Sequence, residues 1–139
     1  MDLNGLAKKL DRISNNCKKE IEKEMKRDTL LIERQAKELA PVDTGYLKSM
    51  IASDVKWSGD MCIGTVTSNA SYGLFLEFGT GRYALGGDGR KTPWCYTFDG
   101  KTFYWTVGQP PQPYMFPAWL YTKDAIFQSL STFAERVFK

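Results

Sequence analysis

The side chains capable of nucleophilic or metal chemistry are few and lie far apart in the sequence. The chain has three cysteines, Cys17, Cys62 and Cys95, and no histidine. The usual general base, the Ser-His and Cys-His nucleophile pairs and the commonest transition-metal ligand are therefore missing. No C-x-x-C pair indicates a zinc ribbon or a redox motif. We expect reduced thiols in the core, no disulfide framework, no metal site and no cofactor.

The carboxylates offer no pair that their spacing would place on one face for general acid–base catalysis. Glu77, between Leu76 and Phe78, is the most interesting of them. The plainest interpretation is a solvated position on the polar side of a short helix, and a buried or interfacial ion pair is the intermediate one. Together with the missing histidine, this pattern predicts that the protein is not an enzyme.

A glycine-rich segment, residues 79–93, holds five glycines together with Arg82, Arg90 and Lys91. It looks like a phosphate loop, but no Gly-Lys pair precedes its threonine, so that motif is rejected. One interpretation is a flexible surface loop. The other is a loop that orders against a partner or lines a nucleic-acid channel, where its cations would contact phosphates without reading the base sequence.

Composition limits the class of protein. The 139 residues are 42% hydrophobic and 14% aromatic, enough for one domain, residues 1–139, with a real core. The net charge is +3, without the clustered basic excess of a protein that binds nucleic acid by itself. The apolar runs are a few residues long, against about 20 for a membrane span, and the N-terminus lacks the apolar region of a secretory signal. We therefore expect no membrane partner.

Residues 1–39 carry the pattern of a long helix. Apolar side chains from Leu3 to Leu39 are spaced by three and four, and Pro41 would end the helix. At 1.5 Å per residue the helix would be roughly 55 Å long. Two interpretations are equally favoured: part of the helix projects or packs on another subunit, or the helix lies over a sheet with a kink at residues 14–16.

The remaining segments predict small elements. Residues 42–78 would hold a hairpin, with strands at 47–57 and 61–68, and a short helix from Tyr72 to Phe78. Residues 94–107 would form an aromatic hairpin with an Asp-Gly turn, its rings packed on a sheet rather than stacked on bases. Residues 117–137 would form the last helix, opened by Pro117. This order predicts an α+β fold, with a long N-terminal helix and a C-terminal helix packed on a small antiparallel sheet.

Three segments resemble a known family. Residues 40–50 (APVDTGYLKSM) resemble the A-P-V-D-T-G-x-L-[KR]-x-S-[IL] signature of tailed-bacteriophage neck proteins, with the serine one position early. Residues 72–81 (YGLFLEFGTG) resemble the family's Y-A-x-x-[VL]-E-F-G-T segment, and residues 112–118 (QPYMFPA) resemble its Q-P-[FY]-[LM]-x-P-A segment. All three occur in the family's order. The chain is thus similar to the head–tail joining or tail-completion (neck) family, which includes the minor tail protein Z of lambda-like phages.

The resemblance implies a non-enzymatic virion protein that is assembled in the host cytoplasm and completes the tail and joins it to the head. It implies a homo-oligomeric ring, of six copies, around the path of the DNA. Its partners would be head-closure or connector proteins on one side and the tail terminator or tail tube protein on the other, with non-specific DNA contact in the channel. The close alternative is the tail terminator itself, and a nucleic-acid-binding accessory protein is a more distant one.

The residues that match the signatures would mainly be scaffold. They would end the first helix, turn the chain into the sheet, end the short helix and fix how the last helix begins. These residues are Pro41, Asp43, Thr44, Gly45, Leu47, Tyr72, Phe78, Gly79, Thr80, Pro113, Pro117 and Ala118. Glu77, Arg82, Arg90 and Lys91 are the candidates for contacts between subunits or with DNA, and Glu77→Ala is expected to lower ring assembly without unfolding the monomer. The aromatic hairpin departs from shorter family members, and its role stays open.

Overall fold

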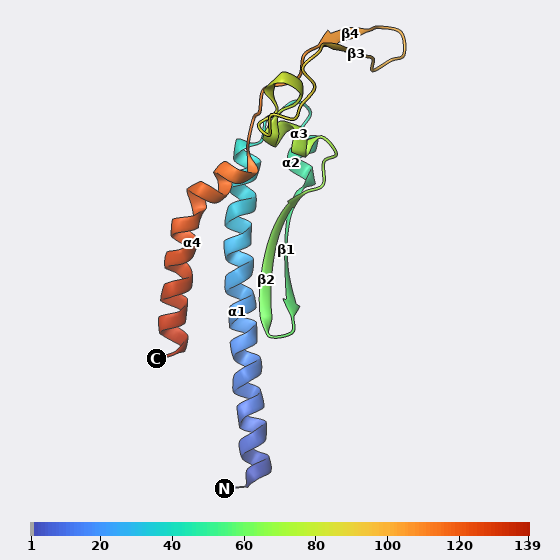
Figure 1. Cartoon of the computed structure of the whole chain (residues 1–139). Helices are drawn as coiled ribbons and strands as arrows, with labels where there is room; N and C mark the ends of the chain where they lie inside the picture. Colours follow the sequence, from blue (N-terminus) through green and yellow to red (C-terminus); the bar gives the residue numbers. More distant parts are fainter. Residues whose placement is uncertain (1) are drawn as a thin grey trace.

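The computed structural model describes residues 2–139, and its elements are arranged along one long helix (Figure 1). In chain order these elements are α1 (Leu3–Leu39), α2 (Tyr46–Met50), β1 (Ile51–Ser58), β2 (Met61–Ser68), α3 (Gly73–Phe78), the 3-10 turn η1 (Gly81–Tyr83), β3 (Trp94–Tyr96), β4 (Tyr104–Thr106) and α4 (Met115–Val137). The strands form two antiparallel two-stranded sheets, β1–β2 and β3–β4. The predicted α+β class, with a long helix at each end of the chain, is confirmed.

Helix α1 runs without a break through 37 residues, so the expected kink at residues 14–16 is wrong. Asp2 caps its start, because its Oδ1 accepts the N–H of Asn4 at 3.2 Å. At the other end Ala40 is extended, with φ −62° and ψ 129°, as the residue before Pro41 must be. The long-helix prediction therefore holds, including its stop signal.

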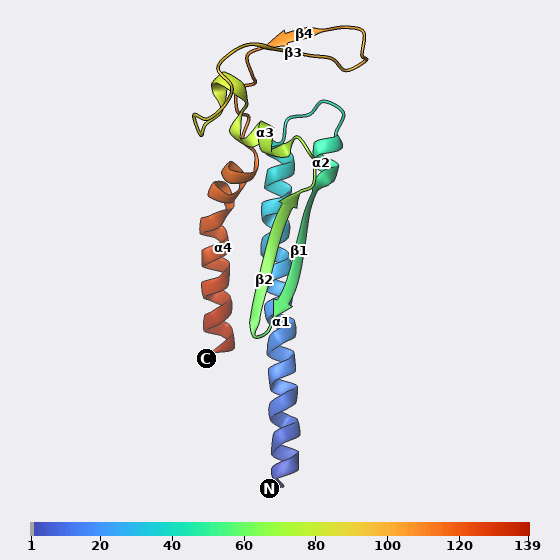
Figure 2. The ribbon, with the colours of Figure 1, turned by 45° about the vertical axis from the view of Figure 1, so that its right-hand side comes forward.

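The two interpretations of this helix prove to be compatible. The β1–β2 hairpin lies along α1 as far as Lys18, whose Nζ is 5.6 Å from the centre of the Trp57 ring. Helix α4 reaches Glu20, whose Oε2 is 3.8 Å from Nη2 of Arg136. Residues 3–17 continue beyond both elements (Figures 1 and 2). Residues 18–39 of α1 thus lie beside other elements of the chain, and residues 3–17 project.

The β1–β2 hairpin shows the alternation that its sequence predicts. Cys62, Gly64, Val66 and Ser68 form the half-buried face of β2, and the residues between them are exposed. A Cβ atom at Gly64 would come within 2.3 Å of Cγ2 of Thr29, so the strand needs glycine where it crosses α1. Glu33 adds a polar link between α1 and β1, since its Oε2 accepts the N–H of Ser53 at 2.9 Å.

The start of the first strand was predicted wrongly. Residues 46–50 form helix α2, not strand, and β1 begins only at Ile51. Gly45 has φ 81°, and its carbonyl accepts the N–H of Ser49 at 3.1 Å, which closes one helical turn. The turn directs Leu47 into the core, where it is buried. A single turn of helix shows no periodicity, so the sequence pattern favours extending the following strand over these residues.

The core lies where the end of α1 meets α2, α3 and the start of α4. It is built largely from small residues, which lets these elements approach closely. Its buried members are Ala36, Ala40, Leu47, Ile51, Ala70, Tyr114 and Ala118. The cysteines are not among them: Cys17 and Cys62 are half-buried, Cys95 is exposed, and all three are free thiols. The expectation of core thiols is therefore wrong.

The aromatic hairpin pairs as predicted, with Tyr96 opposite Tyr104, but it does not pack on the other sheet. It stands away from β1–β2 (Figure 1), and Phe98 and Trp105 are 86% and 75% exposed. Three-residue strands have too little surface to bury these rings. Asp99 organises the tip: its Oδ1 accepts the N–H groups of Lys101 and Thr102, and these bonds lower the pKa of Asp99 to about 2.

Candidate functional site

The three signature segments, residues 40–50, 72–81 and 112–118, meet at one end of the molecule. Together with residues 109–111, which lead into the third segment, they form what we call the signature junction. The backbone N–H of Gln112 donates to the carbonyl of Leu76 at 2.7 Å, and that of Thr80 donates to the carbonyl of Gln109 at 2.9 Å. Between the first two segments, the rings of Tyr46 and Tyr72 lie 6.2 Å apart. The signatures are thus in contact although up to 78 residues separate them in the sequence.

Glu77 caps helix α4 from a distance. Its Oε2 accepts the N–H groups of Tyr114 and Met115 at 2.9 and 3.0 Å, and its Oε1 accepts that of Phe116 at 2.9 Å. Pro117 has no N–H, and the N–H of Ala118 already bonds to the carbonyl of Tyr114. Every backbone donor in the first turn of α4 is therefore accounted for, and a negative charge sits at the positive end of the helix dipole.

The expected solvated position of Glu77 is wrong, because the residue is only 7% exposed. Short helix α3 directs it inward, and its carboxylate oxygens are engaged by amides of its own chain. The side chains that α3 exposes instead are Leu74, Phe75 and Phe78. The sequence contained a signal for this cap, since the N-cap residue of α4 is Tyr114, whose side chain makes no capping hydrogen bond. No spacing rule identifies the partner 37 residues earlier.

Tyr114, a residue of the third signature segment, is among the most buried large residues. Its hydroxyl is 2.9 Å from Oγ of Ser68 at the end of β2. Burial raises the pKa of the Tyr114 phenol. A Cβ atom at Gly73 would lie 2.7 Å from that hydroxyl, so α3 packs directly on it. Tyr114 thus joins the sheet, α3 and α4.

The other signature residues take scaffold positions. Pro41 follows the end of α1, and Thr44 Oγ1 lies 3.4 Å from the N–H of Tyr46. Asp43 is exposed. Gly79 has φ 73° at the end of α3, and Thr80 Oγ1 accepts the N–H of Gln109 at 3.0 Å. Pro113 is exposed just before α4, which begins at Met115, so Pro117 is its third residue and not its first.

An apolar pocket of about 650 Å³ opens in the signature junction. Val42, Tyr46, Tyr72 and Phe75 supply exposed apolar surface to its wall, and Phe98 of the aromatic hairpin reaches its edge. The full lining is Pro41, Val42, Asp43, Thr44, Gly45, Tyr46, Leu47, Tyr72, Phe75, Leu76, Thr80, Phe98, Gln109 and Gln112. This lining suits an apolar segment of a partner better than it suits catalysis, because its only charged group is Asp43.

The glycine-rich loop is more tightly packed than its composition suggests. A Cβ atom at Gly89 would lie 2.1 Å from the carbonyl oxygen of Gly81, so the two backbone stretches touch. Arg82 donates through Nε to the carbonyl of Lys91 at 3.4 Å, and the Arg90 guanidinium lies 5.8 Å from the centre of the Trp94 ring. The three candidate cations are exposed, and these contacts hold them near the base of the aromatic hairpin.

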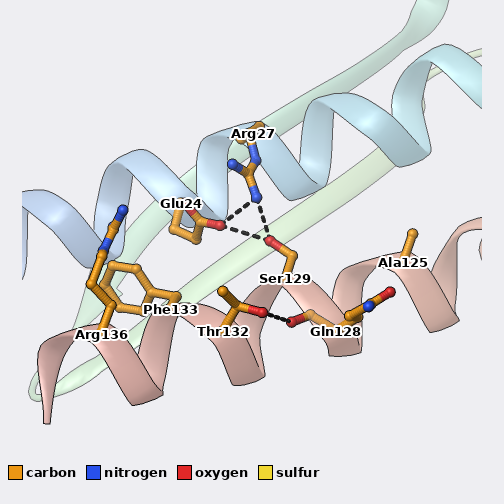
Figure 3. Close-up of a pocket in the computed structure, with 8 residues that line it drawn as sticks. All are labelled: Glu24, Arg27, Ala125, Gln128, Ser129, Thr132, Phe133 and Arg136. Carbon is orange, nitrogen blue, oxygen red and sulfur yellow. Dashed lines mark hydrogen bonds and ion pairs between the residues drawn. The ribbon is translucent and has the colours of Figure 1, made fainter. Parts of the chain in front are cut away.

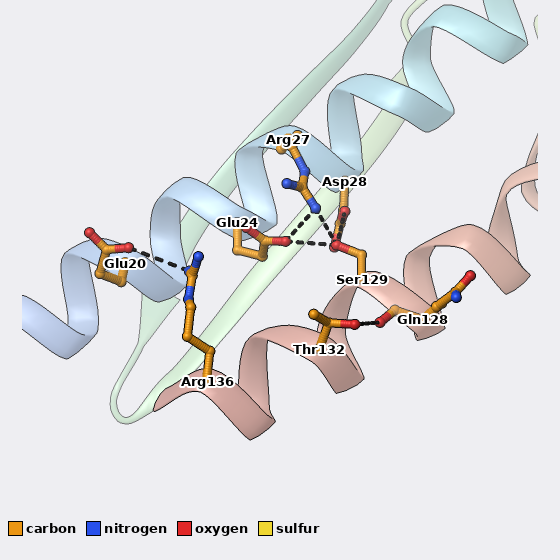
Figure 4. Close-up of polar contacts among 8 residues, drawn as sticks. All are labelled: Glu20, Glu24, Arg27, Asp28, Gln128, Ser129, Thr132 and Arg136. Atoms are coloured by element: carbon orange, nitrogen blue, oxygen red, sulfur yellow. Dashed lines mark hydrogen bonds and ion pairs between the residues drawn. The ribbon is translucent and has the colours of Figure 1, made fainter. Parts of the chain in front are cut away.

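A second polar cluster, which the sequence analysis did not identify, lies between α1 and α4 (Figures 3 and 4). Ser129 Oγ is 2.7 Å from Oε1 of Glu24 and 3.4 Å from Oδ1 of Asp28, and Arg27 bonds both Glu24 and Ser129. Asp28 is 5% exposed and its Oδ2 has no hydrogen-bond partner. Burial, followed by the charge of Glu24, raises the pKa of Asp28. A shallow pocket of about 370 Å³ flanks the cluster.

No metal centre is formed within residues 2–139, where three potential ligands never come together. In the same residues, no helix combines the length and the apolar character that a membrane crossing requires.

Comparison with known proteins then decides the family. A family model described as "Bacteriophage HK97-gp10, putative tail-component" matches residues 4–79, more than half of the chain. The chain belongs to this family. It is therefore a structural component of a phage tail, located in the virion. No curated protein and no solved structure matches it significantly.

The matched stretch shows how the chain relates to this HK97-gp10-like family. It contains α1 from its second residue onward, α2, the β1–β2 hairpin and α3, and thus the first signature segment and most of the second. It ends at Gly79, two residues after the carboxylate that caps α4. The glycine-rich loop, the aromatic hairpin and α4 lie outside it. The similarity to the minor tail protein Z of lambda-like phages remains an expectation from the signatures.

Proposed function

We propose that this tail component forms a neck ring that completes the tail and joins it to the head. In this proposal six copies surround the path of the DNA. The ring contacts head-closure or connector proteins on one side and the tail terminator or tail tube protein on the other. The subunits assemble in the host cytoplasm. Their role is to bind one another and the neighbouring virion proteins, with no catalytic step.

The observation that carries this proposal is the apolar surface that the chain leaves uncovered. The projecting part of α1 exposes Leu3, Leu6, Leu10 and Ile13, and the far end of the molecule exposes the aromatic residues around the junction pocket. Surfaces of this kind mark contacts with other proteins. Because they lie at opposite ends of an elongated subunit (Figure 1), each copy can contact partners at two levels of a particle.

DNA contact is proposed for the glycine-rich loop. Arg82, Arg90 and Lys91 are exposed, and the side chains of Arg82 and Arg90 donate hydrogen bonds to the backbone carbonyls of Lys91 and Pro93. Cations presented in this way interact with phosphates of any sequence, with an affinity that falls steeply as salt rises. Tight binding that discriminates between DNA sequences would instead favour a nucleic-acid-binding accessory protein.

Electron microscopy of particles from a lysogen with this gene deleted tests the proposed function. The control is the same lysogen with the gene supplied on a plasmid. We expect filled heads beside separate tails of normal length. Tails of uncontrolled, excessive length would assign the protein to tail termination, the close alternative. Joined, infectious particles would overturn the neck assignment.

A further inference from the structure

Helix α4 has two faces that carry apolar residues, and one of them packs against α1. The buried residues repeat every four positions along the helix: Ala118, Thr122 and Ile126. At 3.6 residues per turn, a second set of apolar residues is rotated from these by roughly 140°. Phe116, Leu120 and Phe127 of this second set are 63%, 44% and 56% exposed. The second face is thus apolar surface that the subunit leaves open to a partner.

The exposed face of α4 has the spacing of a helix that binds in a groove. Phe116, Leu120, Lys123 and Phe127 occupy positions i, i+4, i+7 and i+11, so they form one ridge along the helix, which we call the α4 ridge. Lys123 is half-buried and is the only charged member of the ridge. Aromatic and leucine side chains in this register are the anchors by which an amphipathic helix binds a hydrophobic groove.

The junction pocket is the matching hollow. It has a volume of about 650 Å³, and Asp43 is the only charged residue of its largely apolar lining. The α4 ridge therefore offers apolar side chains and one cation to a pocket that has apolar walls and one anion. The ridge cannot fill the pocket of its own chain, because Gln112 lines that pocket and α4 begins three residues later and runs away from it along α1 (Figure 1).

We infer that the α4 ridge of one copy binds in the junction pocket of a second copy. Phe116 and Leu120 contact the apolar walls, and Lys123 lies beside Asp43. Different surfaces of the two copies meet, so each copy holds one neighbour with its ridge and another with its pocket. Contacts of this heterologous kind close into a ring when the rotation between copies allows it, whereas a symmetric pairing stops at two copies. The inference rests on the self-association in the proposed function, but not on a position in the neck.

The positions of the two surfaces agree with a ring. The first turns of α4 and the junction pocket lie at the same end of the subunit (Figure 2), so copies joined in this way sit side by side at one level. The projecting part of α1 then stays free for a partner at another level. Burial of Phe116 and Leu120 supplies most of the affinity, whereas an ion pair at the surface, such as that of Lys123 with Asp43, contributes little affinity and selects the orientation.

A disulfide between the two surfaces tests the contact directly. The background is the full chain with its three cysteines replaced, by Cys17→Ser, Cys62→Ser and Cys95→Ser. One form of it carries Leu120→Cys in the ridge, and the other carries Val42→Cys in the exposed wall of the pocket. We expect mild oxidation of the mixture to give a disulfide-linked heterodimer, seen on a non-reducing gel and abolished by a reductant. Circular dichroism checks that both forms keep the fold.

The matched control moves the thiol by one residue. Tyr121→Cys replaces an exposed side chain that follows Leu120 in the sequence but lies on a different face of α4. We expect the Leu120→Cys form to cross-link to the Val42→Cys form at least tenfold faster than the Tyr121→Cys form does. Equal rates, absence of a heterodimer, or faster formation of either homodimer would each overturn the inference, since two ridges or two pockets in contact give homodimers.

Exchange of the two charges gives a second test in the chain with its native cysteines. Asp43→Lys or Lys123→Asp alone places like charges together, and we expect either to weaken self-association about fivefold in sedimentation experiments. The variant with both changes restores an opposite pair and should associate like the wild type. Asp43→Lys with Lys8→Asp has the same net charge but leaves the ridge unchanged, so it should stay weak. A charge-exchanged variant that associates no better than this control would contradict the inference.

The outcome is independent of the particle experiment. If the gene deletion yields joined, infectious particles but the ridge and the pocket cross-link as expected, the neck assignment fails and the contact between copies stands. If heads and tails separate in the deletion but no heterodimer forms, the neck assignment stands and this contact between copies is wrong.

Discussion

Removal of the Glu77 carboxylate tests whether this residue stabilises the subunit or contacts a partner. The carboxylate accepts three backbone N–H groups at the start of α4, and its residue is almost fully buried. In Glu77→Ala these three donors lose their acceptor at once. A buried or half-buried donor left without a partner costs about 1 kcal/mol or more, so we expect the free energy of unfolding to fall by about 3 kcal/mol. For a chain of this size that is a decrease in Tm of about 10 °C.

The charge-neutral variant gives a second, graded result. In Glu77→Gln, the carbonyl oxygen can still accept from Tyr114 and Met115, the two amides that share Oε2. The new NH₂ group would then face the N–H of Phe116, so one hydrogen bond and the favourable charge at the helix end are lost. We expect about half the effect of the alanine variant. Glu135→Ala, at an exposed position of α4, is the control and should change the stability by less than about 0.5 kcal/mol.

Thermal and urea unfolding of the full chain, followed by circular dichroism, measures these differences. The reasoning fails if Glu77→Ala unfolds like the wild type. If particle yield then fell while stability was unchanged, the role expected from the sequence alone, a contact between subunits, would be restored. A loss of stability that matches the number of broken bonds would instead make Glu77 an internal cap, and assembly would fall only because less folded subunit is present.

Three further predictions concern the helix pair, the hairpin and the loop. Burial raises the pKa of Asp28, so the folded chain keeps the carboxyl proton at pH values where the unfolded chain has lost it, and the free energy of unfolding should fall as pH rises above the ordinary aspartate range. Asp28→Asn should remove this pH dependence and stabilise the chain by about 1 kcal/mol at neutral pH, as measured by urea unfolding. Gly64→Val should lower Tm by several degrees, because even its Cβ atom meets Thr29, whereas Gly59→Asn in the open β1–β2 turn should have little effect. Arg90→Glu combined with Lys91→Glu should weaken binding to random-sequence DNA and flatten its dependence on salt, with the fold unchanged by circular dichroism; an unchanged salt slope would exclude this loop from DNA contact.

Patterns that are local in the sequence predicted local structure well. Periodicity identified α1 and its stop at Pro41, and alternation identified the inward face of β2. Both follow from the geometry of a single element, which successive residues report directly. Helix α2 was not predicted because a single helical turn shows no periodicity in the sequence. Helix α4 begins two residues before Pro117 because a distant carboxylate, that of Glu77, stabilises its first turn.

The junction shows why the rest could not be predicted. Glu77 lies in a run of apolar residues, which suggested either a solvated face or a partner. Its acceptors are needed 37 residues later, by three amides that only the folded chain brings to it. The buried Asp28 is similar, since nothing near it in the sequence places Ser129 at its side. Contacts of this kind depend on how elements pack, and periodicity within each element carries no information about them.

The distribution of polar and apolar groups distinguishes two parts of the subunit. The signature junction is stabilised by contacts within the chain, and the projecting part of α1 exposes apolar surface that a partner can bind. At the junction, hydrogen bonds engage the carboxylate of Glu77, the hydroxyl of Tyr114 and the amides that open α4, so little there is left for a partner except the apolar pocket. At the other end, Leu3, Leu6, Leu10 and Ile13 are exposed, yet they form a regular apolar stripe. A projecting helix without a partner gains nothing from such a stripe, because exposed leucines lower solubility and stabilise no fold. The stripe is explained if the folded subunit is an intermediate in assembly, rigid at the junction and completed at the projecting helix by a partner protein.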